Sequence, residues 1–112
     1  MNIYEEIKKI DKQEFSRLVN QGSSSDLCEA LVRGVHHIDD HEWYLENCVF
    51  FLQHPDPEVR GAAVACIGHI ARLGGGDKSE LLRALEPLLN DAELEGRVED
   101  AIDDITIFHA GK

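Results

Sequence analysis

A cluster of histidines and carboxylates is the first feature of this sequence that could do chemistry. His36, His37 and His41 lie within six residues, together with Asp39 and Asp40. Zinc and iron accept imidazole and carboxylate ligands, so a metal site is one interpretation. Neighbouring side chains at helix ends point apart, however, and no HExxH or other spaced ligand pair recurs in the sequence. A polar turn between helices explains the cluster as well, and we assign no metal ligands.

Spacings typical of catalysis are missing from the sequence. We find no Ser, His and Asp in a triad order and no reactive Cys–His spacing. The glycine run 74–76 follows an expected helix instead of opening one after a strand, which is typical of a helix end and linker. We therefore assign no catalytic residues, expect no cofactor, and expect that the protein is not an enzyme.

The acidic side chains are more informative. The 112 residues include 22 Asp and Glu against 11 Lys and Arg, a formal net charge of −11. This charge disfavours nucleic acid and anionic membranes as partners, because phosphate binding needs a basic surface. It suits either plain solubility or attraction to a basic protein.

The densest acidic stretch covers residues 91–104 and contains a single arginine. Asp103 and Asp104 lie toward the C-terminal half of the expected helix, where the helix dipole disfavours negative charge. Like charges at i, i+4 spacing also repel by about 0.2 to 0.5 kcal/mol per pair. This arrangement favours a positive partner, and a solvated face that caps the end of the fold is the alternative. The candidate partner-binding residues here are Glu95, Glu99, Asp100, Asp103 and Asp104.

A second acidic group surrounds the single tryptophan. Leu45 and Val49 already supply the inward stripe of this segment, so we expect Trp43 and Tyr44 to lie partly outward. Aromatic residues ringed by charge are typical of binding hot spots, whereas a lone tryptophan in a small protein is commonly part of the core. The candidate partner-binding residues here are Asp39, Asp40, Glu42, Trp43 and Glu46.

The elements that must position these side chains are helices. Apolar residues recur at helical spacing, and nothing alternates at period two for long enough to predict a strand. We expect about seven helices, the first over residues 3–10 and the last ending near residue 108. Pro87 predicts a kink or an early stop in the sixth. The predicted helix starts are the capping boxes Asp11–Glu14, Asp39–Glu42 and Asp77–Glu80, the caps Asp56 (followed by Pro57) and Asp91, and the cap cluster at residues 23–26.

The segment that begins at Asp56 is repeated 35 residues further on. Asp56 corresponds to Asp91 when the two segments are aligned. Apolar or small residues occupy the same aligned positions in both segments, whereas the residues at the exposed positions differ. A weaker copy covers the N-terminal third. A repeated two-helix unit of this length predicts a solenoid, because each unit buries a face that it could not bury alone. Residues 43–74 and 77–108 are the clearest repeats, and residues 1–40 are a divergent one, in a single domain over 1–112.

Residues 55–68, Pro-Asp-Pro-Glu-Val-Arg-Gly-Ala-Ala-Val-Ala-Cys-Ile-Gly, resemble the HEAT repeat of the type first associated with bilin-lyase subunits. In that pattern an Asp–Pro turn precedes a Val–Arg pair and a helix of small residues. Ala92 and Glu95 depart from it in the second copy, which suggests a capping unit. The resemblance implies a right-handed α-solenoid and a binding surface, not a reaction. His41–Glu42 also resembles the His–Glu pairs of the HEAT-like iron enzyme deoxyhypusine hydroxylase, but that family needs several such pairs.

The environment that we expect is the cytoplasm. Three cysteines without a CxxC pair are typical of free thiols in a reducing compartment, and neither a signal core nor an apolar run of membrane-spanning length is present. Small HEAT-like proteins occur among the immunity proteins of bacterial toxin systems, whose nuclease toxins are often basic. The resemblance and the charge together predict an acidic inhibitor of a basic protein. A scaffold or adaptor that docks a helix or peptide is the first alternative, and a lyase or metal enzyme the second.

Overall fold

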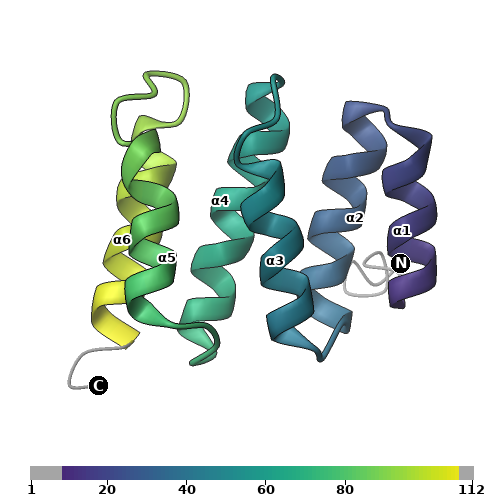
Figure 1. Cartoon of the computed structure of the whole chain (residues 1–112), viewed down its shortest axis with the longest axis horizontal. Coiled ribbons are helices and arrows are strands. Elements are labelled where there is room, and N and C mark those ends of the chain that lie inside the picture. Colours follow the sequence, from purple (N-terminus) through teal and green to yellow (C-terminus); the bar gives the residue numbers. More distant parts are fainter. Residues whose placement is uncertain (1–8, 109–112) are drawn as a thin grey trace, which may run out of the picture.

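The computed structural model describes residues 9–108, except for the side chain of Glu95. Every regular element in this range is helical (Figure 1). The α-helices are α1 (Lys12–Gln21), α2 (Ser24–His37), α3 (His41–Phe51), α4 (Pro57–Arg72), α5 (Lys78–Leu85) and α6 (Glu95–Phe108), and a short 3₁₀ helix, η2 (Glu86–Leu88), follows α5.

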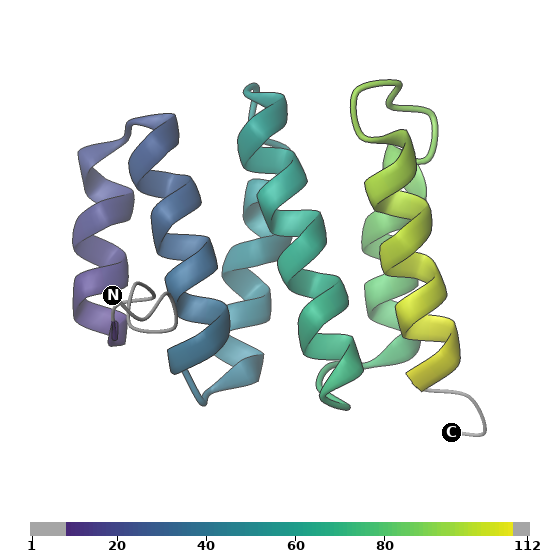
Figure 2. The same ribbon diagram turned by 180° about the vertical axis from the view of Figure 1, so that it is seen from behind.

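The helices are stacked side by side along the long direction of the molecule, as hairpins of two. In Figure 1, α3 and α5 lie in front of α4 and α6, and Figure 2 shows α2, α4 and α6 from the other side. The helix α4 packs against α2, α3 and α6, so it links the three hairpins. The prediction of an all-α solenoid is confirmed.

Small residues on α4 allow α6 to approach closely. Gly61 and Gly68 are buried, and the side chain of Arg97 occupies the place that a Cβ atom at Gly61 would take. A Cβ atom at Gly68 would lie 3.4 Å from Cα of Ala101. The large apolar residues of both helices, such as Ile67 and Ile105, are fully buried between the layers. The repeated segment therefore works as a packing element.

Six of the seven predicted helices have counterparts among the described residues. These residues contain six α-helices and one 3₁₀ helix, η2, which continues the chain after the α-helix before Pro87 ends at Leu85. Proline lacks the N–H that an α-helix needs, so the early stop was predictable. The expected helix over residues 3–10 lies outside the described residues up to residue 8, and Lys9 and Ile10 are not helical.

Aspartate caps start most of the helices, with two corrections. The predicted caps of α1, α4 and α5 are confirmed by bonds such as that from the Glu58 N–H to Oδ1 of Asp56 (2.9 Å). The cap of α3 is Asp40 instead of Asp39, because the Oδ1 of Asp40 reaches the Trp43 N–H (3.1 Å). Asp91 closes a turn over residues 91–94, and α6 begins only after it.

Candidate protein-binding surfaces

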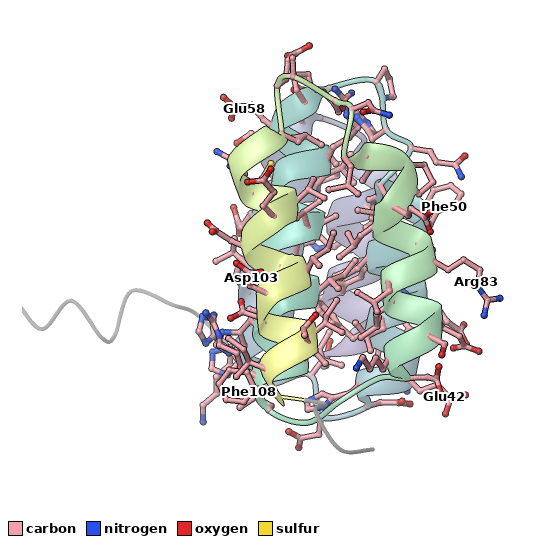
Figure 3. All side chains as sticks on the ribbon, turned by 90° about the vertical axis from the view of Figure 1, so that its left-hand side faces the viewer. Glu42, Phe50, Glu58, Arg83, Asp103 and Phe108 are labelled. Carbon is pink, nitrogen blue, oxygen red and sulfur yellow. The ribbon has the colours of Figure 1, made fainter. Side chains whose placement is uncertain are left out.

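The structure separates the two predicted acidic groups. Figure 3 shows Glu42 and Asp103 on opposite sides of the molecule, the first on the side of α3 and α5 and the second on α6. A single flat partner surface therefore cannot contact both groups at once. The predicted site residues belong to three distinct places.

A groove of about 680 Å³ lies between α3 and α5. Its apolar lining residues are Leu45 and Val49 from α3 and Leu81 and Ala84 from α5. Its acidic lining residues are Glu42 and Glu46 from α3 and Asp77 and Glu80 at the start of α5. All four of these acidic residues are exposed. We call this site the α3–α5 groove.

The carboxylates of the α3–α5 groove form no ion pairs within the described part of the chain, and the exposed Arg83 of α5 lies on the same side of the molecule (Figure 3). Five ion pairs occur among the described residues, and none of them includes Glu42, Glu46, Asp77 or Glu80. One oxygen of Asp77 accepts the Glu80 N–H at 3.0 Å as the cap of α5. The groove therefore combines an apolar floor with negative charge from both of its helices.

Asp40 and Trp43 lie away from the groove, against α1. The Nζ of Lys12 is 2.7 Å from Oδ2 of Asp40 and 5.2 Å from the centre of the Trp43 ring. The hydrogen bonds from Lys12 and from the Trp43 N–H lower the pKa of Asp40. The Trp43 ring is half-buried and packs edge-on against Phe15, with centroids 5.3 Å apart. Asp39 is exposed in the same loop.

The expectation that Tyr44 lies partly outward is wrong. Its side chain is fully buried, and its hydroxyl donates a hydrogen bond to the carbonyl oxygen of Leu31. The ring also packs edge-on against Phe15. Neighbouring positions on a helix are 100° apart, and positions 43 and 44 of α3 both face the core because that core side is broad: Trp43 packs against α1, and Tyr44 against α1 and α2. Tyr44 is thus a core residue.

The acidic residues of α6 form the third place. Glu99, Asp100 and Asp103 are exposed. Asp104 is half-buried and lies 3.5 Å from Nη1 of Arg72. A small hollow of about 160 Å³ contains Asp100 and Asp104 together with the two arginines Arg72 and Arg97. The side chain of Glu95 is outside the described residues. This surface is therefore acidic but partly neutralised by arginines from α4 and α6.

The histidines gather at one end of α2 and α4. The ring centroids of His36 and His69 are 5.2 Å apart. Burial, together with His36 and Arg72 nearby, lowers the pKa of His69. Within residues 9–108, no group of three or more His, Cys, Asp or Glu side chains has a geometry that could hold a metal ion.

Several groove residues were missing from the sequence-based candidates. Asp77 and Glu80 were recognised only as the start of a helix, and Val49 only as part of a core stripe. The structure shows Val49 at 39% exposure and its neighbour Phe50 at 73%. The expectation that Val49 belongs to the inward stripe is therefore wrong: it lies at the edge of α3 that borders the groove, and pairing it with α5 required the three-dimensional arrangement.

Comparisons with known proteins agree with this architecture. The family model of the HEAT repeat matches residues 45–74, which form most of α3 and α4. The match supports the HEAT-repeat family. No curated protein sequence matches the chain significantly.

One solved structure is similar over nearly the whole chain. It is a chain in the crystal structure of a CDI complex from Cupriavidus taiwanensis LMG 19424, with a TM-score of 0.83 and 25% sequence identity. The alignment covers 96% of the present chain and 98% of that chain. The similarity therefore extends well beyond the matched HEAT repeat.

Among the described helices, none has both the length and the apolar character that a membrane-spanning helix needs.

Proposed function

We propose that this protein is a non-catalytic binding module that neutralises a basic toxin, as an immunity protein does. The observation that carries the proposal is the similarity, over 96% of the chain, to a chain of a CDI (contact-dependent inhibition) complex. The net charge of −11 adds the expectation that the partner is basic. The three free cysteines suit a reducing compartment, so we place this function in the bacterial cytoplasm.

The mechanism that we propose is steric and electrostatic. A nuclease holds its nucleic acid with lysines and arginines, because the phosphates dominate its affinity. Carboxylates of this chain would pair with those lysines and arginines and cover the surface on which the nuclease binds its nucleic acid. Opposite charges also steer the two proteins together and raise the association rate, which an inhibitor needs if it must act before the toxin does.

The repeats that present these carboxylates are, in this proposal, HEAT-like units of the bilin-lyase type. The Asp56–Pro57 turn before the small-residue helix α4 supports that assignment. The α5–α6 hairpin, whose sequence departs from the repeat pattern at Ala92 and Glu95, then serves as a capping unit. Its exposed acidic residues satisfy the need of a terminal repeat for a polar outer face.

The test is co-expression with the C-terminal domain encoded by the adjacent upstream gene. We expect that domain alone to arrest bacterial growth and this chain to restore growth through a complex that survives size-exclusion chromatography. A domain that remains toxic beside well-expressed, folded chain would overturn the proposal. So would a domain that never arrests growth.

An adaptor that docks an apolar peptide is the second candidate, and the exposed Phe50 and the apolar floor of the α3–α5 groove favour it. The two candidates differ in their dependence on salt. An inhibitor of a basic protein should associate more slowly as sodium chloride rises, whereas apolar docking should change little. Stopped-flow association rates measured across a salt series distinguish them.

A further inference from the structure

We propose that the α3–α5 groove, and not the acidic surface of α6, receives a positively charged segment of the partner protein. The inference rests on the proposed function for the existence of a protein partner. It goes further by naming the surface and the chemistry that the surface recognises. Three observations carry it: the placement of charge, the apolar floor, and the contrast with α6.

Negative charge lies along both helices that form the groove. Glu42 and Glu46 are one turn apart on α3, and Asp77 and Glu80 are at the start of α5. No lysine or arginine of the described chain forms an ion pair with any of them. A cationic segment lying in the groove would therefore meet carboxylates from both helices, and it would not have to displace an internal partner first.

The floor between these carboxylates is apolar. Leu45 and Leu81 are buried beneath the groove, and Val49 is 39% exposed beside them. Phe50, at 73% exposure, extends the apolar surface along α3 (Figure 3). In protein interfaces, the residues that contribute most of the binding energy are typically apolar residues at the centre, surrounded by a polar rim. The occupant is thus an amphipathic segment, with apolar side chains on one face and lysine or arginine at its edges.

The acidic surface of α6 offers a poorer complement to such a segment. Arg72 already lies 3.5 Å from Asp104. Arg97 lies across Gly61 of α4, between the two helices. An approaching lysine would meet these two arginines as well as the carboxylates, and like charges in an interface are costly. Charge complementarity therefore favours the groove.

The first experiment titrates a short peptide, built only from leucine and lysine at helical spacing, into the ¹⁵N-labelled full chain. We expect the largest amide shifts at groove residues of α3 and α5. The variant Glu42→Gln/Glu46→Gln should raise the dissociation constant of the peptide by about tenfold or more, because it removes two of the four carboxylates. The matched control Asp100→Asn/Asp103→Asn removes the same charge from α6 and should bind within about twofold of the wild type.

Three outcomes of the titration would overturn the inference. These are largest shifts on α6, equal weakening by the two variants, and the absence of binding to the folded wild-type chain. Thermal melts of both variants test whether each is folded. If the glutamine pair were unfolded, the single variant Glu46→Gln, which leaves the first turn of α3 intact, gives the same comparison with Asp103→Asn.

A second experiment repeats the growth rescue with the upstream-encoded toxin domain. The groove is confirmed as the toxin interface if Glu42→Lys/Glu46→Lys abolishes protection while Asp100→Lys/Asp103→Lys still protects. Full protection by the groove variant would exclude the groove as that interface and leave the proposed function standing. Peptide binding in the groove without any rescue by the wild type would instead overturn the proposed function alone.

Discussion

Gly34 of α2 lies against two aromatic rings of the core. A Cβ atom there would be 2.6 Å from Cε1 of Tyr44 and 3.2 Å from Cδ2 of Phe15. The Tyr44 ring is fully buried and its hydroxyl is held by the carbonyl of Leu31, so it has little room to move. We expect Gly34→Ala to lower the free energy of unfolding by about 1 to 3 kcal/mol, in spite of alanine's better helix propensity. Urea denaturation followed by circular dichroism measures the change.

Gly96 provides the control for that substitution. It is also helical, in the first turn of α6, but outside its own helix backbone and its two chain neighbours no described atom lies within 4 Å of the position that its Cβ would take. Gly96→Ala should therefore leave the stability unchanged or raise it by up to about 1 kcal/mol. Losses of equal size in the two variants would contradict the packing argument for Gly34.

The buried thiols and the buried phenol make the fold sensitive to alkaline pH. Burial raises the pKa of Cys66 to about 11 and raises the pKa values of Cys48 and Tyr44 further above their ordinary values. Above about pH 9 for the thiols, and above about pH 10 for the phenol, the unfolded chain releases protons that the folded chain keeps. The free energy of unfolding should then fall by about 1.4 kcal/mol per pH unit for each such group, whereas stability below about pH 8 is unaffected by them.

Urea denaturation between pH 8 and pH 10.5 measures this loss. The variant Cys66→Ala removes one of the titrating groups, so its stability should start lower and fall less steeply with pH. Parallel pH profiles for the variant and the wild type would show that Cys66 does not contribute.

Among the elements, Arg60 of α4 connects two loops. Its Nε is 3.1 Å from Oδ2 of Asp91, and its Nη1 donates to the carbonyl oxygens of His54 and Pro55, each at 2.9 Å. The side chains of Arg60 and Asp91 are only 15% and 20% exposed. We expect Arg60→Ala to destabilise the fold by about 2 to 3 kcal/mol, because the charge-assisted hydrogen bonds to Asp91 and to the carbonyl oxygens before α4 are all lost. Thermal and urea denaturation measure the effect.

Arg17 of α1 is the matched comparison for Arg60. It forms an i, i+3 pair with Glu14 at 2.6 Å, but its side chain is 55% exposed. Arg17→Ala should cost about 0.5 kcal/mol or less, since exposed pairs contribute little. Arg60→Lys keeps the charge without the planar fork of donors, and it should lie between the two. An Arg60→Ala variant as stable as Arg17→Ala would refute the role of Arg60 in linking the loops.

The elements themselves were largely predictable from the sequence. Aspartate caps, Pro57 and Pro87, and the glycines after α4 act locally, so they set helix ends without help from the rest of the chain. Gly74 and Gly76 indeed have φ values of 83° and 84°, which other residues adopt rarely. Capping by Asp39 failed as a prediction because Asp40, one residue later, offers the same carboxylate in the better position.

At the scale of the whole molecule, the excess negative charge should weaken the fold at low ionic strength. With a net charge of −11, self-repulsion acts over the Debye length, which shortens from about 30 Å at 0.01 M salt to about 8 Å at 0.15 M. We expect sodium chloride added over this range to raise the melting temperature by about 4 °C, or about 1 kcal/mol. Differential scanning calorimetry measures it.

The variant Asp100→Lys/Asp103→Lys tests whether net charge causes this salt dependence. It raises the formal charge by four, so its melting temperature should depend less on salt than that of the wild type. A melting temperature that falls with added sodium chloride in the wild type would mean that attractive ion pairs outweigh the repulsion.

The candidate site was less predictable than the fold. Glu42 and Glu46 were identified from their charge, but the groove needs Asp77 and Glu80 as well, about 35 residues away in the sequence. Only the stacking of α5 beside α3 brings the two pairs together. Sequence spacing also could not show that Asp40 is engaged by Lys12, or that Arg72 reaches Asp104, because these contacts join different helices.

Carboxylates on two opposite sides of the stack have a consequence for how a partner arrives. Opposed groups of like charge make opposing contributions to the electric dipole moment across the molecule, so they attract a cation to both sides and not to one alone. We expect a basic protein to reach either side. The shape of the surface then decides which encounters last, and here the groove between α3 and α5 has the larger volume. We expect charge to set the frequency of collisions, and dissociation rates to set which partner proteins this chain distinguishes.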